Sequence, residues 1–280
     1  MLYKAKKLNG YKLNATDGEI GKVKDFYFDD RYFTVRYLIA DTGLWLGDRQ
    51  VLISPYALSD INHELQHINV KLTKAQIKDS PSLDSDKPVS KQFEESYYDY
   101  YGWPYYWGGL NMWGGYPYMV LDSKDWNNNY HHGETWDPHL RSTKAVSGRH
   151  VNAKDGDIGH VVDFIIDDEN WAIRYLVVRT SNWWLGHQVL ISPHWSDNKN
   201  WNDTQISIDL TMEQIKKSPP YVDISAIDKI YERNLHQHYN RMGYWVDEQA
   251  ARIQHNKRFP ENRKIVGADA FGVSDNRDLS

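Results

Sequence analysis

Apolar and polar residues alternate along short stretches of this chain in the pattern of half-buried β-strands. In the N-terminal part, turn-forming residues separate these stretches, and a Thr followed three residues later by Gln marks the start of a short helix. The predicted strands are Ile20–Phe28, Thr34–Ala40, Gln50–Ser54 and Ile68–Leu72, with a turn at Asp29-Asp30 and a helix after Thr73-x-x-Gln76. Short strands and one helical turn in about 80 residues are typical of a small antiparallel β-barrel.

The same pattern occurs a second time. Gly10–Ala40 aligns with Gly148–Val178 without a gap, and 15 of the 31 aligned residues are identical. The match resumes at Trp45–Pro55 and Trp184–Pro193, and the helix signal returns at Thr211-x-x-Gln214. An offset of 138 residues is too long for a solenoid repeat and indicates a duplicated domain.

We therefore expect a mainly β protein of two small antiparallel barrels related by internal duplication, each followed by helical segments. Ser90 as a helix N-cap predicts a helix at Val89–Tyr101, and apolar residues at helical spacing predict its counterpart at Ile224–Met242. The expected divisions are a first barrel at 1–81, a helix and aromatic linker at 82–139, a second barrel at 140–219, a C-terminal helix at 220–245 and a polar tail at 246–280.

The repeated residues resemble the PRC-barrel family in the segments DGEIGKVKDFYFDD, VRYLIADT and VLISP. This family includes the cytoplasmic barrel of the photosynthetic reaction-centre H subunit and the C-terminal domain of the ribosome-maturation factor RimM. The resemblance extends over Leu2–Pro81 and Leu140–Pro219, and we expect neither the membrane helix of the first relative nor the additional N-terminal domain of the second. The chain looks more like soluble bacterial proteins with two PRC barrels. The resemblance implies a scaffold that docks on protein partners.

Several residues that recur in both copies are interpreted as structural. Asp17-Gly18 and Asp155-Gly156 are typical turn dipeptides. The carboxylates around the first hairpin are expected to meet backbone donors and the arginine on the following strand. The recurring residues are Gly18, Gly21, Asp25 and Arg36 in the first copy and Gly156, Gly159, Asp163 and Arg174 in the second.

One motif suggests zinc. His63-Glu64-Leu65-Gln66-His67 has the H-E-x-x-H spacing, which binds zinc when a helix places both imidazoles on one face. Here the motif lies between two predicted strands, so we interpret it as a turn and expect no zinc. A second polar group in the linker, His131, His132, Glu134 and His139, leaves open a metal- or small-ligand-binding enzyme as an alternative.

The linker is unusually aromatic. Tyr97–Tyr118 holds eight Tyr and three Trp together with five Gly and two Pro. Such rings can bind a partner, because Tyr and Trp dominate interface energetics, or they can pack on the barrels and join the two halves. The candidate interaction residues are Trp103, Tyr105, Tyr106, Trp107 and Trp113.

Charge and composition narrow the function classes. The absence of cysteine excludes disulfides and thiolate chemistry, and a net charge of −5 argues against broad nucleic-acid binding. The basic residues of the tail, Arg252, Lys257, Arg258, Arg263 and Lys264, keep an RNA- or ribosome-associated factor as a third alternative. We expect a non-enzymatic, cytoplasmic binding or assembly module with a protein partner and with no catalytic, cofactor or metal site. Self-association and docking on a peripheral membrane complex stay open.

Overall fold

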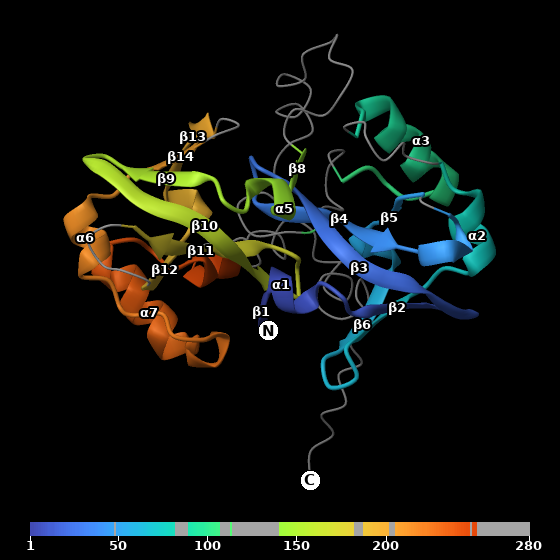
Figure 1. The fold of residues 1–280 in the computed structure, drawn as a ribbon, viewed down its shortest axis with the longest axis horizontal. Helices are drawn as coiled ribbons and strands as arrows, with labels where there is room; N and C mark the ends of the chain where they lie inside the picture. The colour runs from blue at the N-terminus through green and yellow to red at the C-terminus, as the bar shows by residue number, and fades with distance from the viewer. Residues whose placement is uncertain are drawn as a thin grey trace.

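The protein is built from two curled β-sheets that lie side by side (Figure 1). The computed structural model describes residues 1–47, 49–81, 89–106, 113, 140–181, 187–201, 205–246 and 248–250. The first unit contains β2 (Lys12–Ala15), β3 (Gly18–Asp29), β4 (Thr34–Asp41), β5 (Val51–Ile53), β6 (Leu58–Asn62) and β7 (His67–Val70). The second unit contains β9 (His150–Ala153), β10 (Gly156–Asp167), β11 (Ile173–Thr180), β12 (Gln188–Ile191), β13 (Ser196–Trp201) and β14 (Gln205–Ile208).

The two sheets have the same strand order. The first runs β5-β4-β3-β2-β7-β6 and the second runs β12-β11-β10-β9-β14-β13. Each path is open at its ends, and each contains one parallel pair, β2 with β7 or β9 with β14. The mainly β architecture is confirmed, but the expected closed antiparallel barrels are half-barrels that include a parallel pair.

Short helices follow the sheets as the capping residues predict. The Thr73 and Thr211 capping boxes open α2 (Lys74–Asp79) and α6 (Met212–Lys216), and Ser90 caps α3 (Lys91–Tyr101). The predicted helix at Ile224–Met242 is too long. Instead, a 3-10 turn, η5 (Ile224–Ala226), precedes α7 (Lys229–His238), which begins where the Asp228 side chain accepts a hydrogen bond from the backbone N–H of Tyr231.

Two three-residue strands are exchanged between the units. β1 (Leu2–Lys4) pairs with β10 of the second unit, and β8 (Leu140–Ser142) pairs with β3 of the first. Each strand continues into a four-residue helix, α1 (Ala5–Leu8) or α5 (Thr143–Val146). These helices lie between the two sheets in Figure 1. Each sheet is therefore completed by a strand that belongs, in sequence, to the other half.

A reciprocal backbone contact joins the centres of the two units. The Val35 N–H donates to the Trp171 carbonyl at 2.9 Å, and the Ile173 N–H donates to the Phe33 carbonyl at 2.6 Å. Phe33 and Trp171 both have positive φ angles, 47° and 61°, which bulky residues adopt only when tertiary packing requires it. The two turns are therefore held in a costly conformation by this contact.

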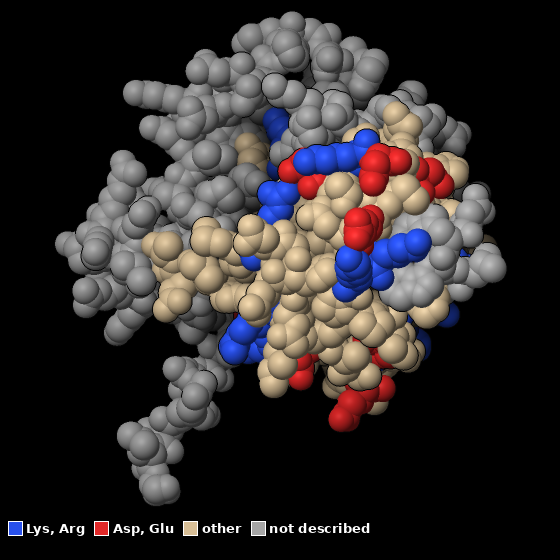
Figure 2. Space-filling view, turned by 90° about the vertical axis from the view of Figure 1, so that its left-hand side faces the viewer, with Lys and Arg blue, Asp and Glu red and all other residues tan. Residues whose placement is uncertain are grey.

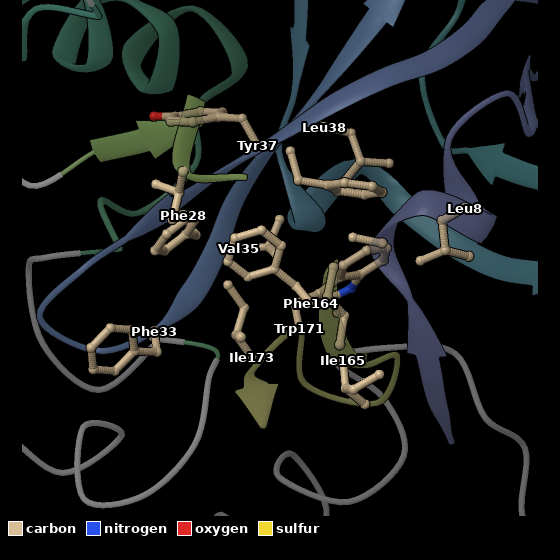
Figure 3. Close-up of a cluster of buried hydrophobic side chains, with 14 of the residues drawn as sticks. Leu8, Phe28, Phe33, Val35, Tyr37, Leu38, Phe164, Ile165, Trp171 and Ile173 are labelled. Carbon is tan, nitrogen blue, oxygen red and sulfur yellow. The ribbon is translucent and has the colours of Figure 1, made fainter. Parts of the chain in front are cut away.

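The core is continuous across this contact. Figure 3 shows Phe28, Phe33 and Val35 from one unit together with Phe164 and Trp171 from the other. The rings of Phe28 and Phe164 have centroids 5.7 Å apart, and those of Phe26 and Trp171 are 6.5 Å apart. The two units pack against each other and share one hydrophobic core.

Two glycines are fixed by a close approach between neighbouring strands. Gly21 and Gly159 have φ angles of 137° and 150°. A Cβ atom would lie 2.0 Å from the Asp41 carbonyl oxygen at the first position and 1.9 Å from the Arg179 carbonyl oxygen at the second. No other residue fits without a shift of the adjacent strand.

Truncating the side chain at the centre should destabilise both units together. Trp171 is only 2% exposed, so Trp171→Ala should lower the free energy of unfolding by about 3–5 kcal/mol. Leu44→Ala, at a fully exposed position, should change it by less than about 0.5 kcal/mol. Urea unfolding followed by circular dichroism measures both. An unchanged midpoint for Trp171→Ala would show that the central contact does not hold the units.

Candidate functional site

Each unit contains a buried cluster around a glutamate on α3 or α7. This glutamate bonds both to a strand of the sheet and to the segment that follows its own helix. The first cluster consists of Arg36 and Tyr37 on β4, Glu94 on α3, Tyr106 and Trp113. The second cluster consists of Arg174 and Tyr175 on β11, Glu232 on α7, Tyr244 and Glu248. The first four residues of each cluster are related by the offset of 138.

The glutamate of each cluster accepts hydrogen bonds from two tyrosines. Tyr37 and Tyr106 both donate to Glu94 Oε1 at 2.8 Å. In the second cluster, Tyr175 donates to Glu232 Oε1 at 2.8 Å and Tyr244 donates to it at 2.9 Å. Each glutamate Oε1 therefore bonds to one tyrosine on a strand and to one tyrosine beyond the helix. These bonds attach the segment that follows α3 or α7 to its sheet.

Burial favours the neutral forms of Tyr37, Tyr175 and Glu232. It raises the pKa of Tyr37 and of Tyr175 well above the usual tyrosine value. Burial also raises the pKa of Glu232, although the hydroxyls of Tyr175 and Tyr244 that donate to its carboxyl group act in the opposite direction.

Backbone turns bring the last tyrosine of each cluster back to the sheet. α3 ends at Gly102, which has a left-handed conformation (φ 66°), and Asn240 has a similar angle (φ 52°) just after α7. Glycine and asparagine are the residues that adopt this conformation most readily at helix ends. The chain therefore reverses direction after each helix and returns Tyr106 or Tyr244 to its glutamate.

The two clusters hold their arginines differently. Arg174 Nε and Nη2 donate to Asp167 Oδ2 at 3.0 and 2.7 Å, and its Nη1 donates to Glu248 Oε1 at 2.6 Å. In the first unit, Asp29 is engaged by Arg31 instead, with Nη2 of Arg31 at 3.1 Å from Oδ2. Although burial opposes the effect, Arg31 and Arg36 keep the pKa of Asp29 below its usual value.

Aromatic contacts replace these ion pairs at Arg36. Its Nη1 donates to the Trp113 carbonyl at 3.1 Å, while its Nε and Nη2 have no hydrogen-bond partner among the residues that the structure describes. The guanidinium carbon lies 4.4 Å from the ring centroid of Tyr106 and 5.4 Å from that of Trp113. Two rings therefore compensate part of the cost of burying this cation.

A pocket of about 620 Å³ opens beside the second cluster. It lies between β1, the β10–β11 turn, the start of α7 and the segment that follows this helix. Its wall includes Arg174, Glu232, Tyr244, Trp245 and Glu248. Because charged and aromatic groups meet in one concave surface, the pocket combines the kinds of groups found in binding sites.

The predicted aromatic residues have different environments. Tyr106 and Trp113 are buried, whereas Trp103 and Tyr105 are half-buried. Trp113 donates from Nε1 to the Val35 carbonyl at 2.7 Å, and Trp103 stacks on Tyr101 with ring centroids 4.4 Å apart. Trp107 lies outside the described residues. Tyr106 and Trp113 thus pack on the first half-barrel.

Asp25 and its counterpart Asp163 contact the exchanged segments and not the arginines. Asp25 accepts hydrogen bonds from the Ser142 and Thr143 hydroxyls and from the Lys144 N–H. Its counterpart Asp163 accepts from the Lys6 N–H at 3.1 Å. The expected pairing with Arg36 and Arg174 is wrong, because these arginines bind the groups described above.

Asp17 and Asp155 also bond to backbone donors. They accept from the Lys74 and Met212 N–H groups, each at 2.8 Å, and so connect the first hairpin to the helix after the sheet. Gly18 and Gly156, which follow them, begin β3 and β10 with φ angles of 138° and 155°. These four residues fit their structural interpretation.

The H-E-x-x-H segment forms the turn between β6 and β7, as predicted. His63 stacks on Tyr3 with ring centroids 3.6 Å apart, and its Nε2 lies 3.4 Å from Asp168 Oδ2. His67 is the first residue of β7. Among the described residues, no three His, Cys, Asp or Glu side chains gather as a metal site would require. The linker histidines and the basic tail lie outside the described residues.

Sequence reasoning missed Glu94, Glu232 and Tyr244. Glu94 lies in the first turn of a helix, where an acidic residue is common on a solvent-exposed face. Its position in the sequence therefore gave no sign that it is buried. The offset of 138 was the available signal, since it relates Glu94 to Glu232 and Tyr106 to Tyr244. Extending the repeat through the helices would have identified both pairs.

Comparison with known proteins gives one family match. Residues 2–77 match the PRC-barrel domain, so a PRC-barrel domain is present in the first half of the chain. A search of curated proteins finds no match. Within the described ranges, the helices are all too short or too polar to cross a bilayer.

The packing of the buried Trp113 side chain should make a measurable contribution to the free energy of unfolding. Trp113 is 4% exposed, so Trp113→Ala should lower the free energy of unfolding by about 3–5 kcal/mol. Tyr100→Ala removes a ring that is 42% exposed and should cost less than about 1.5 kcal/mol. Chemical denaturation of the two variants compares them directly. Equal stability of Trp113→Ala and the parent chain would contradict the joining hypothesis.

The raised pKa of Glu232 predicts a pH dependence. The folded protein holds this proton at pH values where the unfolded chain, with a pKa of 4.5, has lost it. The stabilisation of the fold by protonated Glu232 is complete below the pKa of the unfolded chain. It is lost as the pH rises through the pKa of the folded protein. The stability advantage of the parent chain over Glu232→Gln should therefore shrink as the pH rises above the unfolded value of 4.5 and through the raised pKa of the folded protein.

Urea unfolding across this pH range provides the measurement. Glu169→Gln, which alters an exposed carboxylate, serves as the matched control and should show a much flatter difference. An advantage that grows with pH would mean that Glu232 is buried in its ionised form.

The turn conformation of His63 and His67 predicts that the purified protein retains no stoichiometric zinc. Elemental analysis after dialysis against a weak chelator tests this directly. One zinc per chain that disappears in a His63→Ala, His67→Ala variant would refute the interpretation.

Proposed function

We propose that this protein is a non-enzymatic binding or assembly module that docks on protein partners through two PRC-type half-barrels related by internal duplication. The main support is the PRC-barrel domain at residues 2–77. Its resemblance to barrels that dock on a membrane complex or on a ribosomal protein favours a macromolecular partner over a substrate.

Duplication is supported by correspondences beyond the repeated strands. The two sheets share a strand order, and the exchanged strands, the central hydrogen bonds and the Tyr–Glu–Tyr contacts recur at one offset. Such a chain resembles a symmetric dimer joined into one polypeptide. A shared core fixes the relative position of the units, which suits a scaffold that presents two surfaces at once.

Surface charge favours a protein partner over nucleic acid. On the face of the second unit that Figure 2 shows, basic and acidic side chains are interspersed among uncharged ones. Nucleic-acid binding usually requires a continuous basic surface. This mixed face and the net charge of −5 agree with a cytoplasmic protein that binds other proteins.

Capture under native conditions tests the proposal. The full chain, carrying an affinity tag and cross-linked in cells, should retain a defined protein at constant stoichiometry. A Trp171→Ala chain, in which the contact between the two units should be weakened, should retain it less. Recovery of RNA with steep salt dependence, or of no macromolecule at all, would contradict the proposal.

A further inference from the structure

We propose that the pocket beside the second cluster receives an aromatic side chain, tryptophan before others, from a protein partner. This inference rests on the proposed binding function and names the site and the partner chemistry. The pocket has a volume of about 620 Å³, which is within the usual range for a binding cavity.

The first unit supplies the template for this occupant. There, Trp113 lies against Arg36 and Tyr106, with its indole N–H bonded to a strand carbonyl. The counterparts of Arg36 and Tyr106 are Arg174 and Tyr244, and both line the pocket. The position 138 residues after Trp113 is Ala251, so the repeat does not supply a second indole.

The groups in the pocket wall suit an aromatic ring with a hydrogen-bond donor. Arg174 lies 3.9 Å from the ring centroid of Tyr244, and its planar guanidinium can stack on a second ring, as Arg36 does with Trp113. Trp245 adds an apolar face, and the carboxylates of Glu169 and Glu248 offer acceptors for an indole N–H. Arg174 already has two carboxylate partners, so the pocket does not need an anionic ligand to neutralise it.

Position within the molecule also favours a partner. The pocket lies where the exchanged strand β1, the β10–β11 turn and α7 meet, and Leu2, Asn170 and Lys229 contribute to its wall. A ring bound here would contact elements from both ends of the sequence. Buried aromatic anchors of this kind dominate the energetics of protein interfaces.

Titration of the full chain with N-acetyltryptophanamide tests the inference, with binding followed by saturation-transfer NMR. N-acetylargininamide and N-acetylleucinamide serve as comparison probes and should bind about fivefold more weakly or not at all. Trp245→Ala should weaken binding of the tryptophan probe about fivefold. Tyr100→Ala, which removes an exposed ring that does not line the pocket, should leave binding unchanged.

A second variant guards against loss of folding. Lys229→Trp changes an exposed residue at the rim and should block the probe by covering the pocket, while its circular dichroism spectrum and melting temperature stay close to those of the parent. Equal binding by the parent, Trp245→Ala and Lys229→Trp would overturn the inference, as would preference for the arginine probe. The inference would also be overturned if the probe bound only after the residues that follow Ala250 were removed. In that case the chain's own tail would fill the pocket.

The two proposals fail separately. If a partner is captured equally by the parent, Trp245→Ala and Lys229→Trp chains, the pocket is not the docking site although the proposed function stands. If the tryptophan probe binds as expected but no protein is captured by the parent chain, the proposed function fails.

Discussion

The structure depends on the antiparallel contact between Val35 and Trp171 and its reciprocal, Ile173 with Phe33. These two hydrogen bonds require positive φ angles at Phe33 and Trp171, a conformation that costs on the order of 1–3 kcal/mol per residue. The surrounding aromatic core offsets that cost, because burial of the two rings is possible only when both turns meet. Neither half-barrel can keep its turn conformation alone, so the strand exchange and the shared core form one cooperative arrangement.

The two clusters show how equivalent positions diverge within this symmetric frame. In the first unit, Asp29 accepts a hydrogen bond from Arg31 and not from Arg36. The position equivalent to Arg31 in the second unit is Glu169, whose carboxylate cannot form an ion pair with Asp167, so Asp167 pairs with Arg174. Arg36 then relies on Tyr106 and Trp113, while Arg174 gains Glu248. Both arginines therefore lie over a tyrosine ring, and one exchange of charge in a turn decides which of them also forms an ion pair with the aspartate. The Tyr–Glu–Tyr contact stays the same in both, since it attaches the segment after each helix to the sheet.

Much of this fold was predictable because its signals are local. Alternation located β3, the β-branched and aromatic residues located β4, the repeat located β10 and β11, and the Thr–Gln capping boxes located α2 and α6. β1 was not predictable, because three residues, Leu2–Lys4, carry no measurable period and their partner is more than 150 residues away. The partners of Arg36 and Arg174 were also out of reach, since they depend on how loops return to the sheet. The candidate site follows from the repeat only when the repeat is extended to Glu94 and Tyr106.

The exchanged strands also matter for synthesis of the chain. Leu2–Lys4 leaves the ribosome well before its partner residues, Ile165–Asp167, which follow after a delay on the order of ten seconds at ordinary translation rates. Until Leu140–Ser142 has been made, the edge of β3 that later pairs with β8 is exposed, and an exposed strand edge can pair with another chain. Nascent copies on one messenger RNA carry the matching strand at high local concentration. Crowded translation of this protein therefore favours exchange between chains, and slower initiation favours exchange within one.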